Sequence, residues 1–125
     1  METGRVTTQH LDGDVWLVTA EGEHDLAVSP GIGDTLDDLE RRSGTNIVVD
    51  LTPAEFIDST VLAALARHSD RHDRLIVVVP PDSFARRLFD LVHLQDQLEL
   101  AESVDDALAQ METRRDDPAG RALQF

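Results

Sequence analysis

The sequence of 125 residues contains no cysteine and no lysine, because all eleven of its basic residues are arginine. The absence of cysteine excludes disulfides, thiolate chemistry and cysteine-ligated metals. The absence of lysine excludes the lysine of a P-loop and catalysis through a Schiff base. Apolar runs are short, the longest being 61–66 and 75–79, whereas a membrane helix needs roughly 20 apolar residues. The N-terminus also lacks the features of a signal peptide, so we expect a soluble, cytoplasmic protein without membrane insertion.

The chain is strongly acidic, with a formal net charge of −14 at pH 7. Nucleic-acid binding needs a concentrated basic surface, so the charge argues against a direct nucleic-acid partner. The charge suits a basic protein partner. Electrostatic attraction would speed the association with such a partner, and this effect would weaken as the salt concentration rises. An acidic surface also maintains solubility, and the charge alone does not choose between these roles. The length and the 41% hydrophobic content predict one domain with a single core.

Strand-like and helix-like segments alternate along the chain. The segments with strand composition are 5–10, 15–20, 46–51, 75–79 and 98–100. The helices are expected from Pro30 after a cap at Ser29, from Ser59 to His72, after a cap at Asp82, and from Ser103. Residues 21–28 and 52–58 are expected to form loops. This order predicts an α/β fold, with a mixed, mostly parallel central sheet of about four to five strands and about four helices.

The last residues differ in composition from the rest. Residues 114–125 mix charges with Pro118 and Gly120 and show no useful period. We therefore assign the domain to residues 1–113 and expect residues 114–125 to form a flexible C-terminal tail.

The most informative segment is 48–62, which reads as a buried strand, a short loop and then Asp58-Ser59-Thr60 at the start of an apolar helix. A helix N-terminus offers unpaired backbone N–H groups and the positive end of the helix macrodipole. A phosphate placed on a serine there meets ready-made donors. Ser59 is therefore either a plain N-cap or a phosphate acceptor, and the pattern itself leaves both open.

This segment resembles the signature of the STAS domain, the family of bacterial anti-sigma factor antagonists, in which Asp-Ser-Ser/Thr-Gly-Leu follows a strand ending in Asp-Leu. The segment Gly22-Glu23-His24-Asp25 looks like the family's Gly-x-x-Asp, and Arg86-Arg87-Leu88-Phe89-Asp90 resembles its basic-basic-Leu-Phe-Asp on the third helix. The resemblance spans about residues 5–112. The predicted order of strands and helices also matches the STAS fold.

The resemblance implies that Ser59 is the regulatory phosphorylation site. It further assigns the surroundings of the phosphosite and the partner-binding surface to these residues: Asp25, Asp58, Thr60, Val61, Ala63 and Arg67. Val61 stands where the family usually has glycine. Its β-branched side chain adds bulk beside the serine, which would narrow the choice of partner if a partner's backbone approaches there.

The function implied by the resemblance is a phosphorylation-controlled switch that regulates sigma-factor-dependent transcription, as in a stress response. The unmodified chain would bind an anti-sigma factor with serine kinase activity, which would phosphorylate Ser59 with ATP, and a serine phosphatase would reset the system. The chain would be a substrate and a ligand, not an enzyme, and would need no cofactor. The alternative is a STAS adaptor that never switches and acts as a scaffold subunit of a signalling or transport complex.

Three other classes fit the residues less well. In a hydrolytic triad an acid orients a histidine, but Asp58 adjoins Ser59 and no Gly-x-Ser-x-Gly is present. A receiver domain would use Asp50 at a strand end, yet no lysine is available to hold the acyl phosphate. His68 and His72 lie four residues apart on one predicted helix face. Without a further ligand we expect two solvated surface histidines, and no metal site is predicted.

Overall fold

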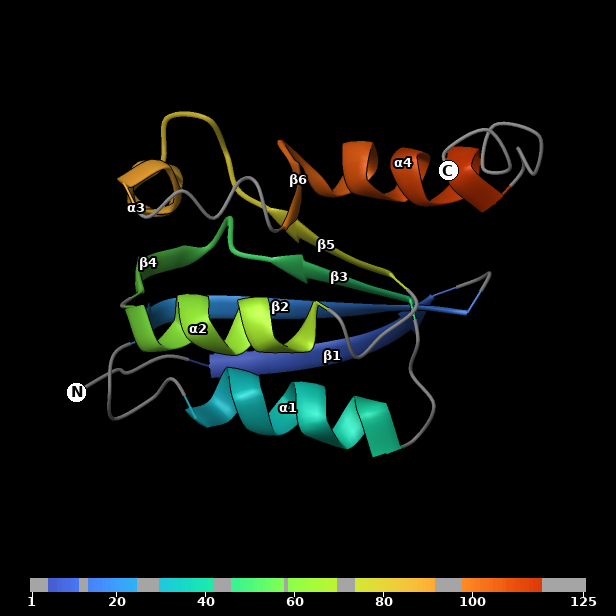
Figure 1. Cartoon of the computed structure of the whole chain (residues 1–125), viewed down its shortest axis with the longest axis horizontal. Coiled ribbons are helices and arrows are strands. Elements are labelled where there is room, and N and C mark those ends of the chain that lie inside the picture. The colour runs from blue at the N-terminus through green and yellow to red at the C-terminus, as the bar shows by residue number, and fades with distance from the viewer. Residues whose placement is uncertain are drawn as a thin grey trace.

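The computed structural model describes residues 5–11, 14–24, 30–41, 46–57, 59–69, 74–91 and 98–115. These residues form six strands and four helices (Figure 1). In chain order they are β1 (Arg5–Leu11), β2 (Val15–His24), α1 (Pro30–Arg41), β3 (Asn46–Asp50), β4 (Ala54–Ile57), α2 (Ser59–His68), β5 (Arg74–Val78), α3 (Phe84–Leu91), β6 (Glu99–Ala101) and α4 (Val104–Arg115).

The strands form one mixed sheet of order β1-β2-β3-β5-β6, and β4 pairs with β2 outside this path. The β1–β2 pair is antiparallel, whereas β2, β3, β5 and β6 run parallel. The central strands β3 and β5 are buried along most of their length, as expected of parallel strands that are covered on both faces. The predicted mixed, mostly parallel sheet with helical cover is confirmed.

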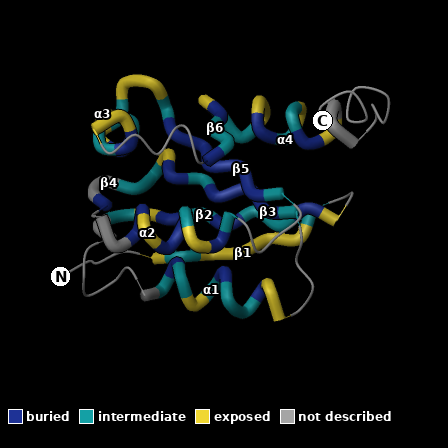
Figure 2. The backbone as a smooth tube through the Cα atoms, viewed as in Figure 1, coloured by how far each residue is buried: buried dark blue, intermediate teal, exposed yellow. Residues whose placement is uncertain are grey.

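Helices cover both faces of the sheet: in Figure 1, α1 is drawn below the strands, α2 in front of β2, and α4 at the top. The larger core cluster joins one face of the sheet to α1, α2 and α3, and includes Leu36, Leu65 and Phe89. The smaller cluster joins the opposite face to α4 through Ala107 and Met111. Exposed residues are concentrated on β1 and on the outer sides of the helices (Figure 2). None of the helices in the described part of the chain has both the length and the apolar character needed to cross a bilayer.

The structure corrects the two loops that the sequence predicts around the candidate site. Strand β2 continues to His24 instead of ending at residue 20, and 54–57 form β4. These two segments pair in parallel, with a shift of register between Gly22 and Glu23. Gly22 has a φ of 81°, a left-handed conformation that glycine adopts without steric cost. The two paired segments lie about 30 residues apart in the chain, so the sequence of either segment alone does not predict that it forms a strand.

The helix boundaries are partly as predicted. Helix α1 begins at Pro30, and Ser103 caps α4 because its Oγ accepts a hydrogen bond from the backbone N–H of Asp106 at 3.1 Å. The predicted cap at Asp82 is wrong. Ser83 performs this role, accepting from the N–H of Arg86 at 3.1 Å, because the turn after residue 79 is closed by a bond from Ser83 N to Pro80 O at 3.1 Å.

The ends of α2 and α4 differ from the ends that the sequence predicts, and the residues that follow each helix lie partly outside the described part of the chain. Helix α2 ends at His68, and residues 70–73 lie outside the described residues. Helix α4 runs to Arg115. Residues 116–125 also lie outside, so the flexible tail stays a prediction.

Candidate functional site

The N-terminus of α2 is positioned by a hydrogen-bonded connection from β3. At the end of β3, Asp50 Oδ1 accepts from the N–H of Thr52 at 2.9 Å, and Ala54 N donates to Leu51 O at 3.0 Å. Two longer-range bonds tie this turn to its neighbours, from Leu51 N to Val78 O and from Gly22 N to Pro53 O, both at 3.1 Å. The chain that leads into α2 is therefore fixed to both β2 and β5.

Helix α2 begins at Ser59, the residue that the sequence singles out. The backbone thus places residue 59 in the first turn, where helix N–H groups have no intrahelical acceptor and the macrodipole is positive. The side chains of Ser59 and Thr60 lie outside the described part of the chain, as do Asp25 and Asp58. Whether these four groups meet stays a prediction.

The two faces of α2 are sharply different. Val61, Leu62 and Leu65 are buried in the larger core cluster, whereas Ala63 and Arg67 are exposed. Residue 59 precedes Ala63 by four positions, so 59, 63 and 67 share one helical phase. We call Ala63 and Arg67 the exposed strip of α2; residue 59 precedes this strip at the same spacing.

Val61 does not lie on the exposed strip, because its side chain is 0% exposed. The apolar pattern of the helix predicts this burial, which is confirmed, so the added bulk of Val61 lies inside the domain and not on a surface that a partner contacts. A buried valine fills the core beneath the first turn of α2, where a glycine would leave that volume to other side chains. Any effect of Val61 on a partner must act through the position of the helix.

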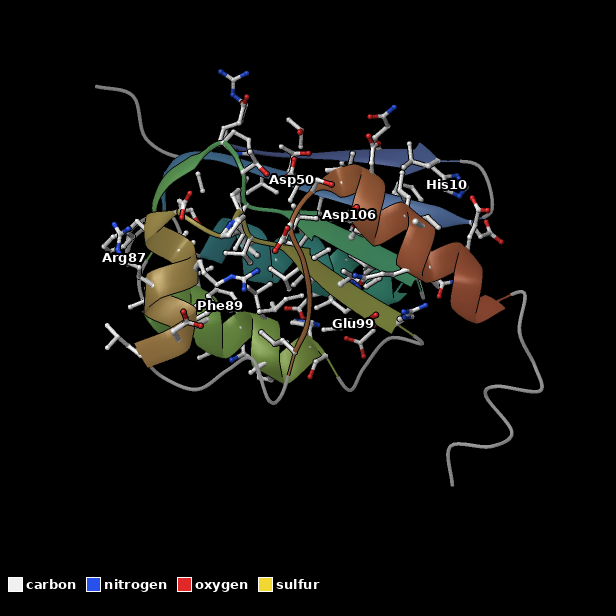
Figure 3. All side chains as sticks on the ribbon, turned by 90° about the horizontal axis from the view of Figure 1, so that it is seen from above. His10, Asp50, Arg87, Phe89, Glu99 and Asp106 are labelled. Atoms are coloured by element: carbon white, nitrogen blue, oxygen red, sulfur yellow. The ribbon has the colours of Figure 1, made fainter. Side chains whose placement is uncertain are left out.

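Helix α3 packs against β4 and brings its two arginines to the same end of the sheet as the start of α2 (Figure 1). Arg86 Nη2 donates to Val79 O at 3.0 Å, which fastens α3 to the end of β5. Arg87 is exposed and points away from the domain, whereas Phe89 on the same helix points toward the sheet (Figure 3). The Arg-Arg-Leu-Phe-Asp motif therefore combines a structural arginine, a solvated arginine and a core aromatic.

Asp50, the candidate phosphoacceptor of the receiver-domain alternative, is the last residue of β3 (Figure 3). Its carboxylate accepts the N–H of Thr52 and so shapes the turn after β3. That bond gives Asp50 a structural role in positioning the chain before α2.

His68 differs most from what the sequence predicts. Instead of being solvated it is 0% exposed, at the last residue of α2. Its Nε2 lies 3.0 Å from Asp37 Oδ1 and its Nδ1 lies 3.9 Å from Glu40 Oε1, both on α1. The packing of α1 on α2 creates this cluster. No local signal reveals it, although Asp37 and Glu40 share a helix face at a spacing of three. His72 lies outside the described residues.

The fold and the site define a class: a small α/β domain that presents a helix N-terminus and an exposed helix strip at the carboxyl end of its parallel strands. The chain belongs to the STAS domain family, whose model matches residues 5–107. The comparison with curated proteins finds none that matches the chain.

Several solved structures of similar fold are of anti-sigma factor antagonists. One from Mycobacterium paratuberculosis is 26% identical, with a TM-score of 0.79 over 86% of this chain and 93% of its own. A putative one from Thermotoga maritima is 16% identical, with a TM-score of 0.74 over 84% and 92%. The Bacillus cell fate determinant SpoIIAA, in its phosphorylated form, is 13% identical, with a TM-score of 0.63 over 86% and 99%.

Proposed function

We propose that this chain is an anti-sigma factor antagonist whose affinity for an anti-sigma factor is set by phosphorylation of Ser59. The observation that carries the proposal is the position of Ser59 as the first residue of α2 in a STAS domain. The structure of SpoIIAA in a phosphorylated form supports it, because it shows that a protein of this fold takes a phosphate.

The proposed binding surface is the exposed strip of α2. Ala63 presents a small side chain one turn after residue 59, which lets a partner approach the helix closely. Arg67 supplies a cation one turn further on. Basic groups of the partner away from residue 59 complement the chain's net charge of −14, and an acidic group of the partner faces residue 59. The unmodified chain binds this partner and thereby releases the sigma factor.

Phosphorylation opposes binding by electrostatics and bulk. A phosphoserine adds about −1.5 to −2 charges and three acceptor oxygens. A like-charge pair at about 4 Å costs ~1 kcal/mol in water and ~4 kcal/mol at an interfacial dielectric. Because about 1.4 kcal/mol corresponds to a tenfold change in affinity, one modification is enough to dissociate the complex. The N-terminus of α2 stabilises the phosphate within the domain, so the fold survives the modification.

In this proposal the chain is a ligand and a substrate. The anti-sigma factor carries the serine kinase activity and uses ATP, and a separate serine phosphatase removes the phosphate. The non-switching adaptor draws its support from Val61 in place of the family's usual glycine. Because Val61 is buried, its side chain does not obstruct a partner at the helix surface, and the switch is the function we put forward.

The decisive experiment combines phosphosite mapping with binding. The chain is recovered from its native host under several stresses, and its phosphorylated residues are mapped by mass spectrometry. The host's ATP-binding anti-sigma factors are then purified and titrated against the unmodified chain, Ser59→Ala and Ser59→Asp. We expect phosphate on Ser59, tight binding of the unmodified chain and of Ser59→Ala, and at least tenfold weaker binding of Ser59→Asp.

The matched control is Ser69→Ala, which removes a serine just beyond the other end of α2. Ser69 Oγ donates to Ala66 O at 2.8 Å, so its loss affects only the end of the helix. This variant should be phosphorylated and bound like the unmodified chain. Unmodified Ser59 under every stress, with equal binding of all variants, would instead establish a constitutive adaptor.

A further inference from the structure

His68 is the one polar side chain that the described part of the chain fully buries. It closes the last turn of α2 and faces α1, where Asp37 and Glu40 present their carboxylates to its two ring nitrogens. The ring is fixed by the surrounding core. The two carboxylates are 45% and 41% exposed, so they reach solvent. The cluster therefore has a buried imidazole on its inner side and two half-exposed carboxylates on its outer side.

The three side chains lie close enough to converge on one ion, once the Glu40 carboxylate turns from Nδ1, its neighbour in the structure, toward the Nε2 side of the ring. One ligand atom from each of the three residues lies within 4.8 Å of the other two. A metal ion with ligand bonds near 2.1 Å in tetrahedral geometry holds its ligand atoms about 3.4 Å apart. His68 Nε2 and Asp37 Oδ1, at 3.0 Å, are already close to that spacing. Glu40 follows Asp37 by three positions on α1, which places both carboxylates beside the same ring.

We propose that Asp37, Glu40 and His68 form a binding site for a divalent transition metal of the zinc class. The imidazole selects this class, because Mg²⁺ and Ca²⁺ prefer oxygen ligands alone. Three protein ligands leave one tetrahedral position for water, which the exposed side of the cluster admits. Two carboxylates with a neutral imidazole balance the charge of the ion. Binding replaces the direct contact between His68 and Asp37.

The site lies at the opposite end of α2 from residue 59. The ten residues of α2 extend over about 15 Å at 1.5 Å per residue. A bound ion joins the last turn of α2 to α1 through ligands on both helices. By mass action it stabilises the folded domain, because the unfolded chain does not bring the three ligands together. This inference goes beyond the proposed switch and does not depend on it.

The test is a calorimetric titration of Zn²⁺ into the full chain, treated first with a chelator and kept near neutral pH. We expect saturable binding of one ion per chain. Asp37→Asn and Glu40→Gln should each weaken it at least tenfold, since each removes a ligand while keeping the side chain's size. The matched control is Asp34→Asn, an exposed acid on α1 outside the cluster, which should bind as the unmodified chain does.

Two further measurements separate loss of metal binding from loss of folding, and neither depends on phosphorylation of Ser59. Circular dichroism of the carboxylate variants checks that α1 and α2 are intact, and Co²⁺ in place of Zn²⁺ gives a visible spectrum that reports nitrogen ligation. The spectrum should disappear in His68→Gln. Three results would each overturn the proposal: no saturable binding, equal binding by all variants, or competition by Mg²⁺ at a similar concentration. The first would leave the cluster as an ion pair between helices.

Discussion

Arg74 on β5 binds Glu99 on β6 through two parallel hydrogen bonds, from Nε to Oε1 at 2.8 Å and from Nη2 to Oε2. Its Nη1 also donates to Gln110 O on α4 at 2.8 Å. The two side chains are only 13% and 31% exposed. One guanidinium thus joins two neighbouring strands to the helix that covers them, at the edge of the sheet where β6 is three residues long.

Removal of this ion pair should destabilise the domain. We expect Glu99→Gln to lower the free energy of unfolding by about 1.5–3 kcal/mol, the usual range for hydrogen bonds to charged groups. Arg74→Ala should cost more, because it also leaves Gln110 O without this donor. Urea denaturation followed by circular dichroism gives both values.

The control for this prediction is Arg5→Ala. Arg5 Nε lies 3.8 Å from Glu21 Oε1 between two largely exposed side chains, and exposed pairs of this kind contribute less than about 1 kcal/mol. If Glu99→Gln lowered the free energy of unfolding as little as Arg5→Ala, the Arg74–Glu99 pair would not stabilise the edge of the sheet.

Substitutions of the buried Val61 should lower the free energy of unfolding without removing a contact to the partner. Val61→Ala removes two buried methyl groups, each contributing about 0.8 kcal/mol, and leaves a cavity, so we expect a loss of about 2 kcal/mol. Val61→Gly should lose about 1 kcal/mol more through its lower helix propensity. The exposed Ala63→Gly isolates that propensity term. A neutral Val61→Ala in urea denaturation would contradict the buried position of this side chain.

The exposed strip of α2 can be blocked without disturbing the core. Under the proposed function, Ala63→Arg should weaken anti-sigma factor binding at least tenfold, because it places a long side chain one turn from Ser59. Ala109→Arg makes the same change on an exposed position of α4, over the opposite face of the sheet, and should leave binding unchanged. Equal effects of both variants would show that charge, and not the strip, controls binding.

Truncation of two apolar residues of α3 should lower the free energy of unfolding by very different amounts. Phe89 is fully buried, whereas Leu91 is 76% exposed. Phe89→Ala should cost about 3–5 kcal/mol, and Leu91→Ala should stay within about 0.5 kcal/mol of the unmodified chain. Thermal denaturation of the two variants side by side distinguishes them. A large loss for Leu91→Ala would mean that this residue is covered in solution.

Much of the fold follows from local sequence. The apolar runs at 46–51 and 75–79 predict central strands because such strands are buried on both faces, and Ser59 marks a helix start because its neighbours form an N-terminal pattern. The same logic places Ser103 as the cap of α4.

What the sequence does not predict depends on contacts between distant segments. Strand β4 exists because 54–57 meet the last residues of β2. His68 is buried because α1 packs against α2, and its carboxylate neighbours lie 28 and 31 positions earlier in the chain. The burial of Val61 follows from the apolar spacing of α2, whereas its listing among partner-binding residues came from the family resemblance alone. Asp25, Asp58 and the side chains of Ser59 and Thr60 stay predictions.

The attachment of β4 has a kinetic consequence for any enzyme that must reach residue 59. Among the described residues this four-residue strand pairs with the end of β2 alone, across a shift of register, whereas β3 and β5 pair with each other along five residues. Short ladders at the end of a sheet open at a lower free energy than the core strands. Amide hydrogens of 54–57 should therefore exchange faster than those of β3 and β5. The segment 54–57, which leads into residue 59, is then able to leave the sheet while the rest of the domain stays folded.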